Sequence, residues 1–253
     1  MLTWANDAPH DNLSAIARAI CDRHTGVGAD GWILVAPAAK GARYDASIRL
    51  LNADGSGAEM SGNGTRCAAA FLIDAGVTAG PDVGILTGAG LKTLRLLRRR
   101  GLWFLFEMNM GRPELARGEV RSTIALSSGD REVTILNVGN PQCVVFVDSF
   151  DFDWRSLGAE IERHPAFPNR TNVSFVRVLD RNTIDVRFFE RGAGETMSSG
   201  TGSTGAMAAA VLRGAAESPV RVITPGGPIE FRWEGDVFLT APAEITAGGE
   251  FYY

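Results

Sequence analysis

SGNGTRCAAAFL (residues 61–72) recurs later in the chain as SGTGSTGAMAAAVL (residues 199–212). Each copy reads Ser-Gly-x-Gly and continues into a run of small residues, which predicts a turn followed by a helix. Glycine at the start of a helix leaves backbone N–H groups accessible to a ligand, and the helix dipole favours an anion there. Two such turns facing one another would hold one carboxylate, and each would bring one serine hydroxyl to the bound group.

The 253-residue chain is 45% hydrophobic and 21% charged, which predicts a globular protein with a substantial core. Its net charge of −4 gives no reason to expect nucleic acid or an acidic membrane surface as a partner. No apolar run approaches the ~18 residues that a membrane span needs, and no signal peptide is visible. The cysteines and histidines lack metal-site or disulfide spacing, so we expect a cytoplasmic protein with reduced thiols and no bound metal.

Apolar periodicity and turn residues predict four helices and a larger number of strands. Helices are expected at 13–21, 62–76, 154–163 and 200–214, with Asp11 or Asn12 capping the first and Asp153 the third. Strands are expected at 32–36, 44–52, 83–87, 92–98, 102–109, 124–127, 132–138, 143–147, 172–179, 183–190, 220–224, 228–233 and 237–241. The basic run Arg98-Arg99-Arg100 is expected to form a solvated hairpin turn.

Gly111-Arg112-Pro113 is a candidate domain boundary, because the order of strands, Ser-Gly-x-Gly turn, helix and strands restarts after it. We predict a first domain over 1–112 and a second over 113–242, with a final strand at 243–253 that returns to the first. The second turn begins 138 residues after the first. Two similar halves that each present a helix N-terminus predict a pseudo-twofold protein with its site in the cleft between them.

Five segments, in this order and at this spacing, together resemble the diaminopimelate epimerase family. They are Asn-Ala-Asp-Gly-Ser at 52–56, Ser-Gly-Asn-Gly-Thr-Arg-Cys at 61–67, Gly-Asn-Pro at 139–141, Phe-Pro-x-Arg-Thr-Asn-Val at 167–173 and Glu-Arg-Gly-Ala-Gly-Glu-Thr at 190–196. The resemblance runs from about Leu13 to the C-terminus, where Thr-Ala-Pro-Ala-Glu at 240–244 also fits.

The resemblance implies an α/β (α+β) fold of two pseudo-symmetric domains, each a curled, mostly antiparallel sheet around a central helix. It implies an amino-acid epimerase that needs no cofactor such as pyridoxal phosphate and uses two bases, with one thiol on each face of the substrate α-carbon. The substrate would be a small amino acid, and the family tendency makes a homodimer possible.

The resemblance also implies which residues bind the substrate. One carboxylate would lie on the backbone amides of Gly62, Asn63, Gly200 and Thr201. The distal end of the substrate would be bound by Asn52, Asn140, Asn172 and Arg191. An arginine with three amides suits a second amino acid head group, because a guanidinium forks a carboxylate and amide oxygens accept from an ammonium group.

The chain departs from the family at the proton-transfer groups, because the two catalytic cysteines are replaced by Ser61 and Ser199. A thiol has a reference pKa of about 8.5, whereas a serine hydroxyl is a far weaker acid and forms little alkoxide near pH 7 without an adjacent base. Serine can donate a proton, but it is a poor base for a weakly acidic α-proton. Both directions of a racemisation would therefore suffer.

Further departures surround these serines. The histidine that usually follows Gly-Asn-Pro is Gln142, which cannot take a proton, and a further cysteine after the second turn is Thr204. Cys67 matches a non-catalytic family position and is expected to pack. Glu190 is the one titratable group expected close to the site, where it would act as a base directly or orient Ser199.

The start of the chain also differs, because the family opens with a strand that carries His-Gly-x-Gly-Asn-Asp-Phe. Met1-Leu2-Thr3-Trp4 resembles the continuation of that strand. Either the start is a misassigned internal methionine or the first strand has been lost. Loss would leave the neighbouring strand with an unpaired edge and would remove one substrate contact.

Several functions fit these residues. The first is epimerisation of LL- to meso-diaminopimelate, in lysine and peptidoglycan precursor biosynthesis, or racemisation of a related amino acid. The second is a lyase or dehydratase of the same superfamily, and the third is a catalytically impaired homologue that only binds an amino acid. Ser61 and Ser199 could also be ordinary helix caps, and Glu190 with Arg191 a structural ion pair. Deliberate replacement would also give two serines, but the changes at Thr204 and Gln142 favour natural divergence.

Overall fold

The protein is described by a computed structural model over residues 1–116 and 118–252. The chain divides into two compact units. Unit 1 consists of Met1–Asn109 together with the segment from Ala241 onward, and unit 2 of Met110–Thr240. The boundaries predicted from the sequence lay after residues 112 and 242.

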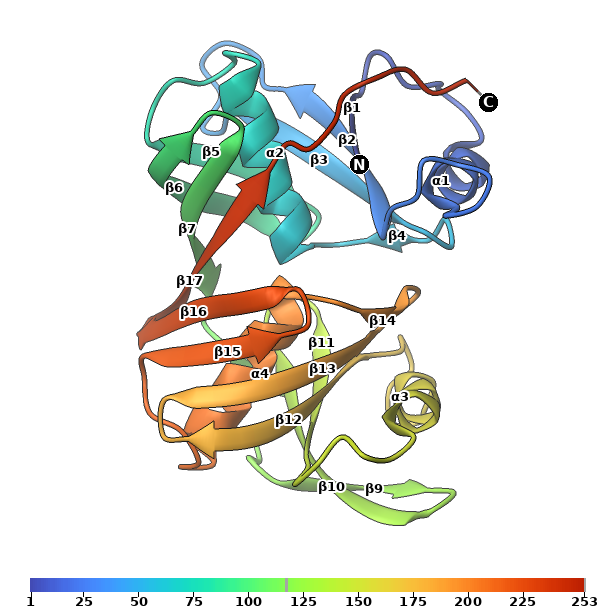
Figure 1. The fold of residues 1–253 in the computed structure, drawn as a ribbon, viewed down its shortest axis with the longest axis vertical. Coiled ribbons are helices and arrows are strands. Elements are labelled where there is room, and N and C mark those ends of the chain that lie inside the picture. Colours follow the sequence, from blue (N-terminus) through green and yellow to red (C-terminus); the bar gives the residue numbers. More distant parts are fainter. Residues whose placement is uncertain (117, 253) are drawn as a thin grey trace. The chain divides into compact units, whose positions relative to one another are not determined.

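Unit 1 is a mostly antiparallel sheet with two helices (Figure 1). Its elements are β1 (Leu2–Trp4), α1 (Leu13–Cys21), β2 (Gly31–Pro37), β3 (Ala46–Asn52), β4 (Gly57–Ala58), α2 (Gly62–Asp74), β5 (Asp82–Thr87), β6 (Gly90–Arg100) and β7 (Trp103–Gly111). The pairs β2–β3, β3–β4, β5–β6 and β6–β7 are antiparallel, whereas β1–β2 and β3–β5 are parallel. A parallel pair needs a crossover connection, and α2 lies in the connection between β3 and β5.

Helix α2 packs against β1, β2, β3, β5 and β6 and is the centre of unit 1 (Figure 1). Its alanines at 68–70 are almost fully buried, because small side chains let the helix approach the curled sheet closely. A second apolar cluster lies under α1, where Ile16 and Ile20 pack with Trp32 and Leu51.

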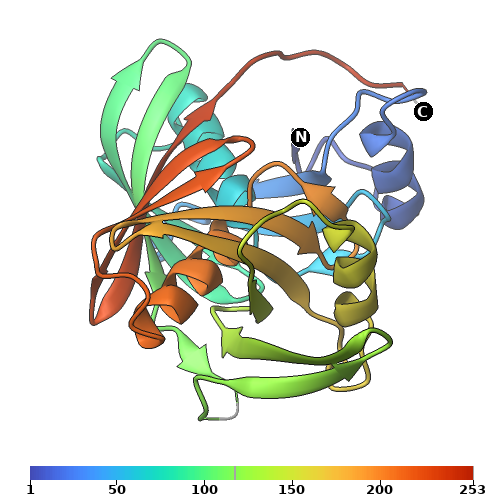
Figure 2. The same cartoon turned by 60° about the horizontal axis from the view of Figure 1, so that its bottom comes forward.

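Unit 2 repeats this plan with three additional strands at its beginning. Its elements are β8 (Glu114–Leu115), β9 (Ser122–Leu126), β10 (Gly129–Asn137), β11 (Pro141–Phe146), α3 (Trp154–Glu162), β12 (Asn172–Asp180), β13 (Thr183–Glu190), β14 (Gly194–Thr196), α4 (Gly200–Leu212), β15 (Val220–Thr224), β16 (Gly227–Glu234) and β17 (Asp236–Glu244). The last residues of β17, from Ala241, belong to unit 1. Helix α4 is buried from Gly200 to Ala210 and packs against β11, β12, β13 and β15. Figure 2 shows α3 against β12 and β13, to which it is packed.

The internal repeat extends to the pairing of the strands. The series β1 to β7 corresponds to β11 to β17, with one helix after the first strand and one after the short fourth strand. The parallel pairs β1–β2 and β3–β5 correspond to β11–β12 and β13–β15, so α2 and α4 are equivalent crossover helices. This arrangement confirms the predicted fold class of two similar sheets, each around a central helix.

The first strand of each repeat pairs with its neighbours through the backbone. In unit 2, β10 pairs antiparallel with β11. In unit 1, β1 pairs with β2 in parallel through Leu2, Thr3 and Trp4. The side chain of Trp4 also packs on Phe71 of α2, with ring centroids 4.3 Å apart.

Two predictions about unit 1 were wrong. Arg98, Arg99 and Arg100 belong to β6 and pair with β7, and the turn lies at Gly101-Leu102 instead, where Gly101 takes a positive φ of 58°. The predicted strand at 243–253 ends with β17 at Glu244, and residues 245–252 carry no regular secondary structure (Figure 2). This tail does return to unit 1, because Ile245 N donates to Leu102 O at 3.0 Å.

The predicted helix caps differ in their outcome. The Asp153 side chain accepts from Ser156 N at 3.1 Å, so it caps α3 as predicted. Asn12 occupies the cap position of α1 in a left-handed conformation, but its side chain makes no capping hydrogen bond. None of the helices in the described part of the chain is long and apolar enough to cross a membrane.

Candidate active site

Ser61 and Ser199 are the N-caps of α2 and α4, and their backbones take nearly the same conformation. The φ and ψ angles are −135° and 121° at Ser61 and −136° and 122° at Ser199. Each hydroxyl accepts from the third residue of its helix, at 3.1 Å from Gly64 N and 3.0 Å from Gly202 N. Both serines are therefore helix caps, which is one of the roles that the sequence allowed.

The backbone of each turn can also hold an anion. The first N–H groups of a helix have no acceptor inside the helix. In α2 the first two belong to Gly62 and Asn63, and in α4 they belong to Gly200 and Thr201. These are the four amides that the sequence predicted for a carboxylate. We call residues 61–64 the α2 cradle and residues 199–202 the α4 cradle.

The serine of the α4 cradle is hydrogen-bonded to a carboxylate. Ser199 Oγ donates to Glu190 Oε2 at 2.7 Å, and Thr196 Oγ1 donates to Glu190 Oε1 at 2.6 Å. Ser199 thus accepts one hydrogen bond from Gly202 N and directs its own proton to the carboxylate. Of the two roles predicted for Glu190, this geometry supports the one in which it orients Ser199 and can take its proton.

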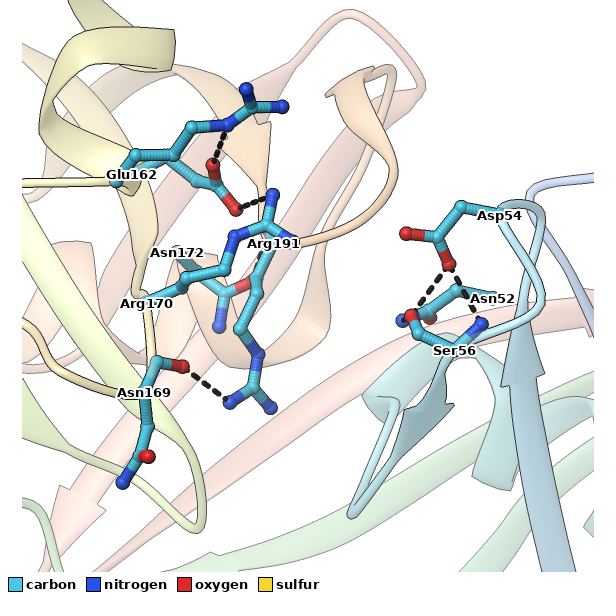
Figure 3. A network of polar contacts seen from close by, with 9 residues as sticks. Asn52, Asp54, Ser56, Glu162, Asn169, Arg170, Asn172 and Arg191 are labelled. Carbon is cyan, nitrogen blue, oxygen red and sulfur yellow. Dashed lines mark hydrogen bonds and ion pairs between the residues drawn. The ribbon is translucent and has the colours of Figure 1, made fainter.

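The α2 cradle has no such carboxylate at its serine. Within the described residues, no hydrogen bond joins Ser61 Oγ to Asp or Glu. The position that matches Glu190, 138 residues earlier at the end of β3, holds Asn52. Asn52 Nδ2 donates to Ser56 Oγ at 3.0 Å, and Ser56 is bonded to Asp54 in a small network (Figure 3). The two serines therefore have different chemical surroundings.

Three of the four predicted distal ligands, Asn140, Asn172 and Arg191, belong to unit 2, where hydrogen bonds hold the loops that carry them. Asn172 accepts from Arg191 N at 3.0 Å through Oδ1, and its Nδ2 donates to Pro141 O at 3.0 Å. Asn140 Nδ2 donates to Thr201 Oγ1 at 3.3 Å, which connects this network to the α4 cradle. The fourth predicted ligand, Asn52, belongs to unit 1.

Comparison with known proteins identifies the family. The sequence profile of diaminopimelate epimerase matches residues 2–116 and 134–245. The chain belongs to the diaminopimelate epimerase family. It is 38% identical to the diaminopimelate epimerase of Pelotomaculum thermopropionicum over 96% of this chain and 90% of that protein. It is 44% identical to the enzyme of a Synechococcus species over 90% of this chain and 85% of that protein.

Solved structures with the same fold are more distant in sequence. A hydroxyproline epimerase from Agrobacterium vitis superposes with a TM-score of 0.71 at 19% identity, covering 90% of this chain and 78% of that one. A protein described as a predicted epimerase, from Pseudomonas aeruginosa, superposes with a TM-score of 0.68 at 16% identity, covering 98% of this chain and 92% of that one. At these identities the likeness shows the fold, and the family assignment rests on the closer sequence relatives.

Gln142, which stands at the histidine position of the family, is fully buried in this network. Its Nε2 donates to Asn140 Oδ1 at 2.6 Å, whereas its Oε1 has no hydrogen-bond partner. Gln142 therefore orients Asn140 through a hydrogen bond, and it offers no proton-accepting group comparable to imidazole.

Sequence reasoning missed the ion pair that holds the loop before β12. Glu162, only 1% exposed, ends α3, and Arg170 Nη2 lies 2.5 Å from its Oε1 (Figure 3). Arg170 has a positive φ of 61°, which is uncommon for a residue other than glycine. Asn169 O in the same loop accepts from Arg191 Nη1 at 3.2 Å. The sequence did contain a signal for this ion pair, because Arg170 lies in the segment at 167–173 that resembles the family. Only Asn172 of that segment was assigned a role.

The last glycine of each cradle is required for close packing. A Cβ built on Gly202 would lie 2.8 Å from Phe188 Cδ1 and 2.9 Å from Ser199 Oγ. A Cβ on Gly64 would lie 2.6 Å from Ile33 Cδ1, which is the far end of a flexible side chain. Phe188 is a buried ring on β13 and has less freedom to move.

We therefore expect Gly202→Ala to lower the free energy of unfolding by about 1–2 kcal/mol, because the steric cost of the added methyl group exceeds the stabilisation from the higher helix propensity of alanine. Gly64→Ala should cost less, because Ile33 can change rotamer. The control is Gly57→Ala, where a Cβ meets nothing within 4 Å and φ is not positive. Urea unfolding of the three variants measures the differences, and equal midpoints for Gly202→Ala and Gly57→Ala would contradict the packing argument.

Proposed function

We propose that this protein is a cofactor-independent epimerase that inverts an α-carbon of diaminopimelate, in the supply of lysine and peptidoglycan precursors. The observation that carries the proposal is the pair of serine-capped helix N-termini, one of which has its hydroxyl bonded to Glu190. The named relatives support diaminopimelate as the substrate. Homodimer formation and a cytoplasmic location stay predictions.

The chain offers the groups that such an inversion needs. Binding on the amides of a cradle stabilises the substrate carboxylate and the negative charge that develops when the α-proton leaves. At Ser199, the hydroxyl takes the α-proton as Glu190 receives the hydroxyl proton, so that no free alkoxide is formed. At Ser61, the hydroxyl delivers a proton to the opposite face while it takes a proton from solvent, because no acid bonded to Ser61 among the described residues neutralises the alkoxide that would otherwise form. The reverse reaction is harder, because Ser61 has no comparable carboxylate to take its proton.

The proposed function predicts exchange at the substrate α-carbon. In D2O, LL-diaminopimelate should lose its α-proton NMR signal and appear as deuterated meso isomer, at a rate that falls in Ser199→Ala. Chromatography on a chiral phase measures the inversion, while NMR measures the exchange. Elimination of a group from an added substrate would instead support a lyase, and binding without any exchange would support an impaired homologue. The comparisons favour neither of these alternatives.

A further inference from the structure

Arg66 is a buried cation inside the first turns of α2. Its side chain is only 5% exposed, and Nη1 has no hydrogen-bond partner. Burial lowers the pKa of the guanidinium to about 10, which still leaves it charged at neutral pH. No ion pair to Arg66 occurs within the described residues, so its charge is not neutralised there. A buried charge without a counter-ion is costly, which suggests a role beyond packing.

The guanidinium points back toward the α2 cradle. Arg66 Nη2 donates to Asn63 Oδ1 at 2.8 Å, and Arg66 Nε donates to Pro242 O at 3.4 Å. Helical side chains lean toward the N-terminus of their helix, so Arg66 reaches the second helical residue from one turn away. The unpartnered Nη1 belongs to the same planar group that holds Asn63, and it adds positive charge at the end where the helix dipole is already positive.

The α4 copy of the motif lacks this charge. The position 138 residues after Arg66 is Thr204, whose hydroxyl donates to Gly200 O at 2.8 Å within its own helix. In place of a buried cation, the α4 copy has the carboxylate of Glu190 bonded to its serine. The α2 copy of the motif therefore carries a buried cation, whereas the α4 copy has an anion bonded to its serine.

We propose that Arg66 is a positioning residue that holds Asn63 and gives the α2 cradle the positive charge with which it binds the substrate carboxylate. The substrate in this statement rests on the proposed function. With Arg66, the α2 cradle then binds a carboxylate more tightly than its backbone amides alone would. A bound carboxylate would also provide the counter-ion that Arg66 lacks.

The first experiment separates binding from turnover. In Arg66→Gln, the KM and the calorimetric Kd for LL-diaminopimelate should rise about tenfold or more, as expected for loss of a charge-assisted interaction, while kcat changes less than about threefold. Arg66→Lys keeps the charge and should stay within about threefold of the wild type in Kd. The matched control is Arg213→Gln. Arg213 is another largely buried arginine with an unpartnered nitrogen, at the C-cap of α4, and its loss should leave KM unchanged.

The second experiment does not depend on the identity of the substrate. Sodium formate, the smallest carboxylate, is titrated while the backbone amide NMR signals of Gly62 and Asn63 are followed. Formate should shift both signals in the wild type and in Arg213→Gln, with an apparent Kd about tenfold weaker in Arg66→Gln. If diaminopimelate fails to bind but formate binding still depends on Arg66, the proposed function fails and the inference stands.

Two results would overturn the role of Arg66. One is a folded Arg66→Gln protein that binds formate and diaminopimelate as the wild type does, even if its urea midpoint falls, because Arg66 would then be structural only. If Arg66→Gln does not fold, Arg66→Lys decides: affinity near that of the wild type supports the proposal, and a tenfold loss in the folded lysine variant contradicts it.

Discussion

Replacing Ser61 and Ser199 together with cysteine is expected to raise kcat for diaminopimelate epimerisation about 100-fold or more, because general acid–base catalysis is most efficient when the pKa of the group lies near the working pH. Both serines are helix N-caps, and a helix N-terminus lowers the pKa of a thiol further from about 8.5. The glycines and the backbone amides of both cradles, and the predicted distal ligands, are unchanged in the variant. The rates of exchange and inversion in D2O, measured between pH 7 and 9, test the expectation.

The single variants make this prediction sharper. A two-base inversion removes the proton on one face and delivers it on the other, so each single cysteine should accelerate exchange mainly for one of the two stereoisomers. Ser61→Cys should accelerate exchange of the isomer that Ser61 deprotonates by more than Ser199→Cys accelerates exchange of the other isomer. The reason is that Ser61 has no carboxylate like Glu190, which is bonded to Ser199. Cys67→Ser in the double variant is the control for a stray thiol on α2. A double variant that stays inert even at alkaline pH would show that the serines do not limit the rate.

The regular elements could be predicted from the sequence because their signals are local. Helix α1 and strand β15 have the predicted bounds, and α2 and α4 each end two residues before the predicted glycine. The errors occur where pairing depends on distant residues. Strands β4 and β14 have two and three residues and exist only through pairing with β3 and β13. The arginines of β6 look like a turn by composition, but their backbone groups pair with β7.

The candidate site shows the same division between local and distant signals. Serine before glycine at a helix start predicts both the cap and the cradle, and both geometries occur at Ser61 and Ser199. The partners of a buried charge depend on the tertiary fold. For that reason sequence reasoning could not choose between two roles for Glu190, and it missed Thr196, Glu162 and Arg66. Substrate binding by the predicted amides and distal residues remains a prediction.

Glu190→Gln is expected to lower kcat about 100-fold or more with little change in KM, because the amide keeps the shape of the carboxylate but cannot take the proton of Ser199. In the wild type both carboxylate oxygens accept hydrogen bonds, from Ser199 and Thr196, and an amide can accept only one of them without turning an N–H toward a donor. The matched control is Glu195→Gln in β14, which removes a carboxylate that is paired with Arg155 on the surface. It should retain nearly full activity.

The effect of Glu190→Gln should also depend on what stands at position 199. In the background of Ser61→Cys with Ser199→Cys, a thiol ionises without help from a carboxylate to a far greater extent than a hydroxyl does, so the loss caused by Glu190→Gln should shrink. Residues that act as a unit show such non-additive effects, and a double-mutant cycle on kcat measures the coupling. Equal losses in the serine and cysteine backgrounds would mean that Glu190 acts independently of residue 199. In that case it would abstract the α-proton itself, which is the other role that the sequence allowed.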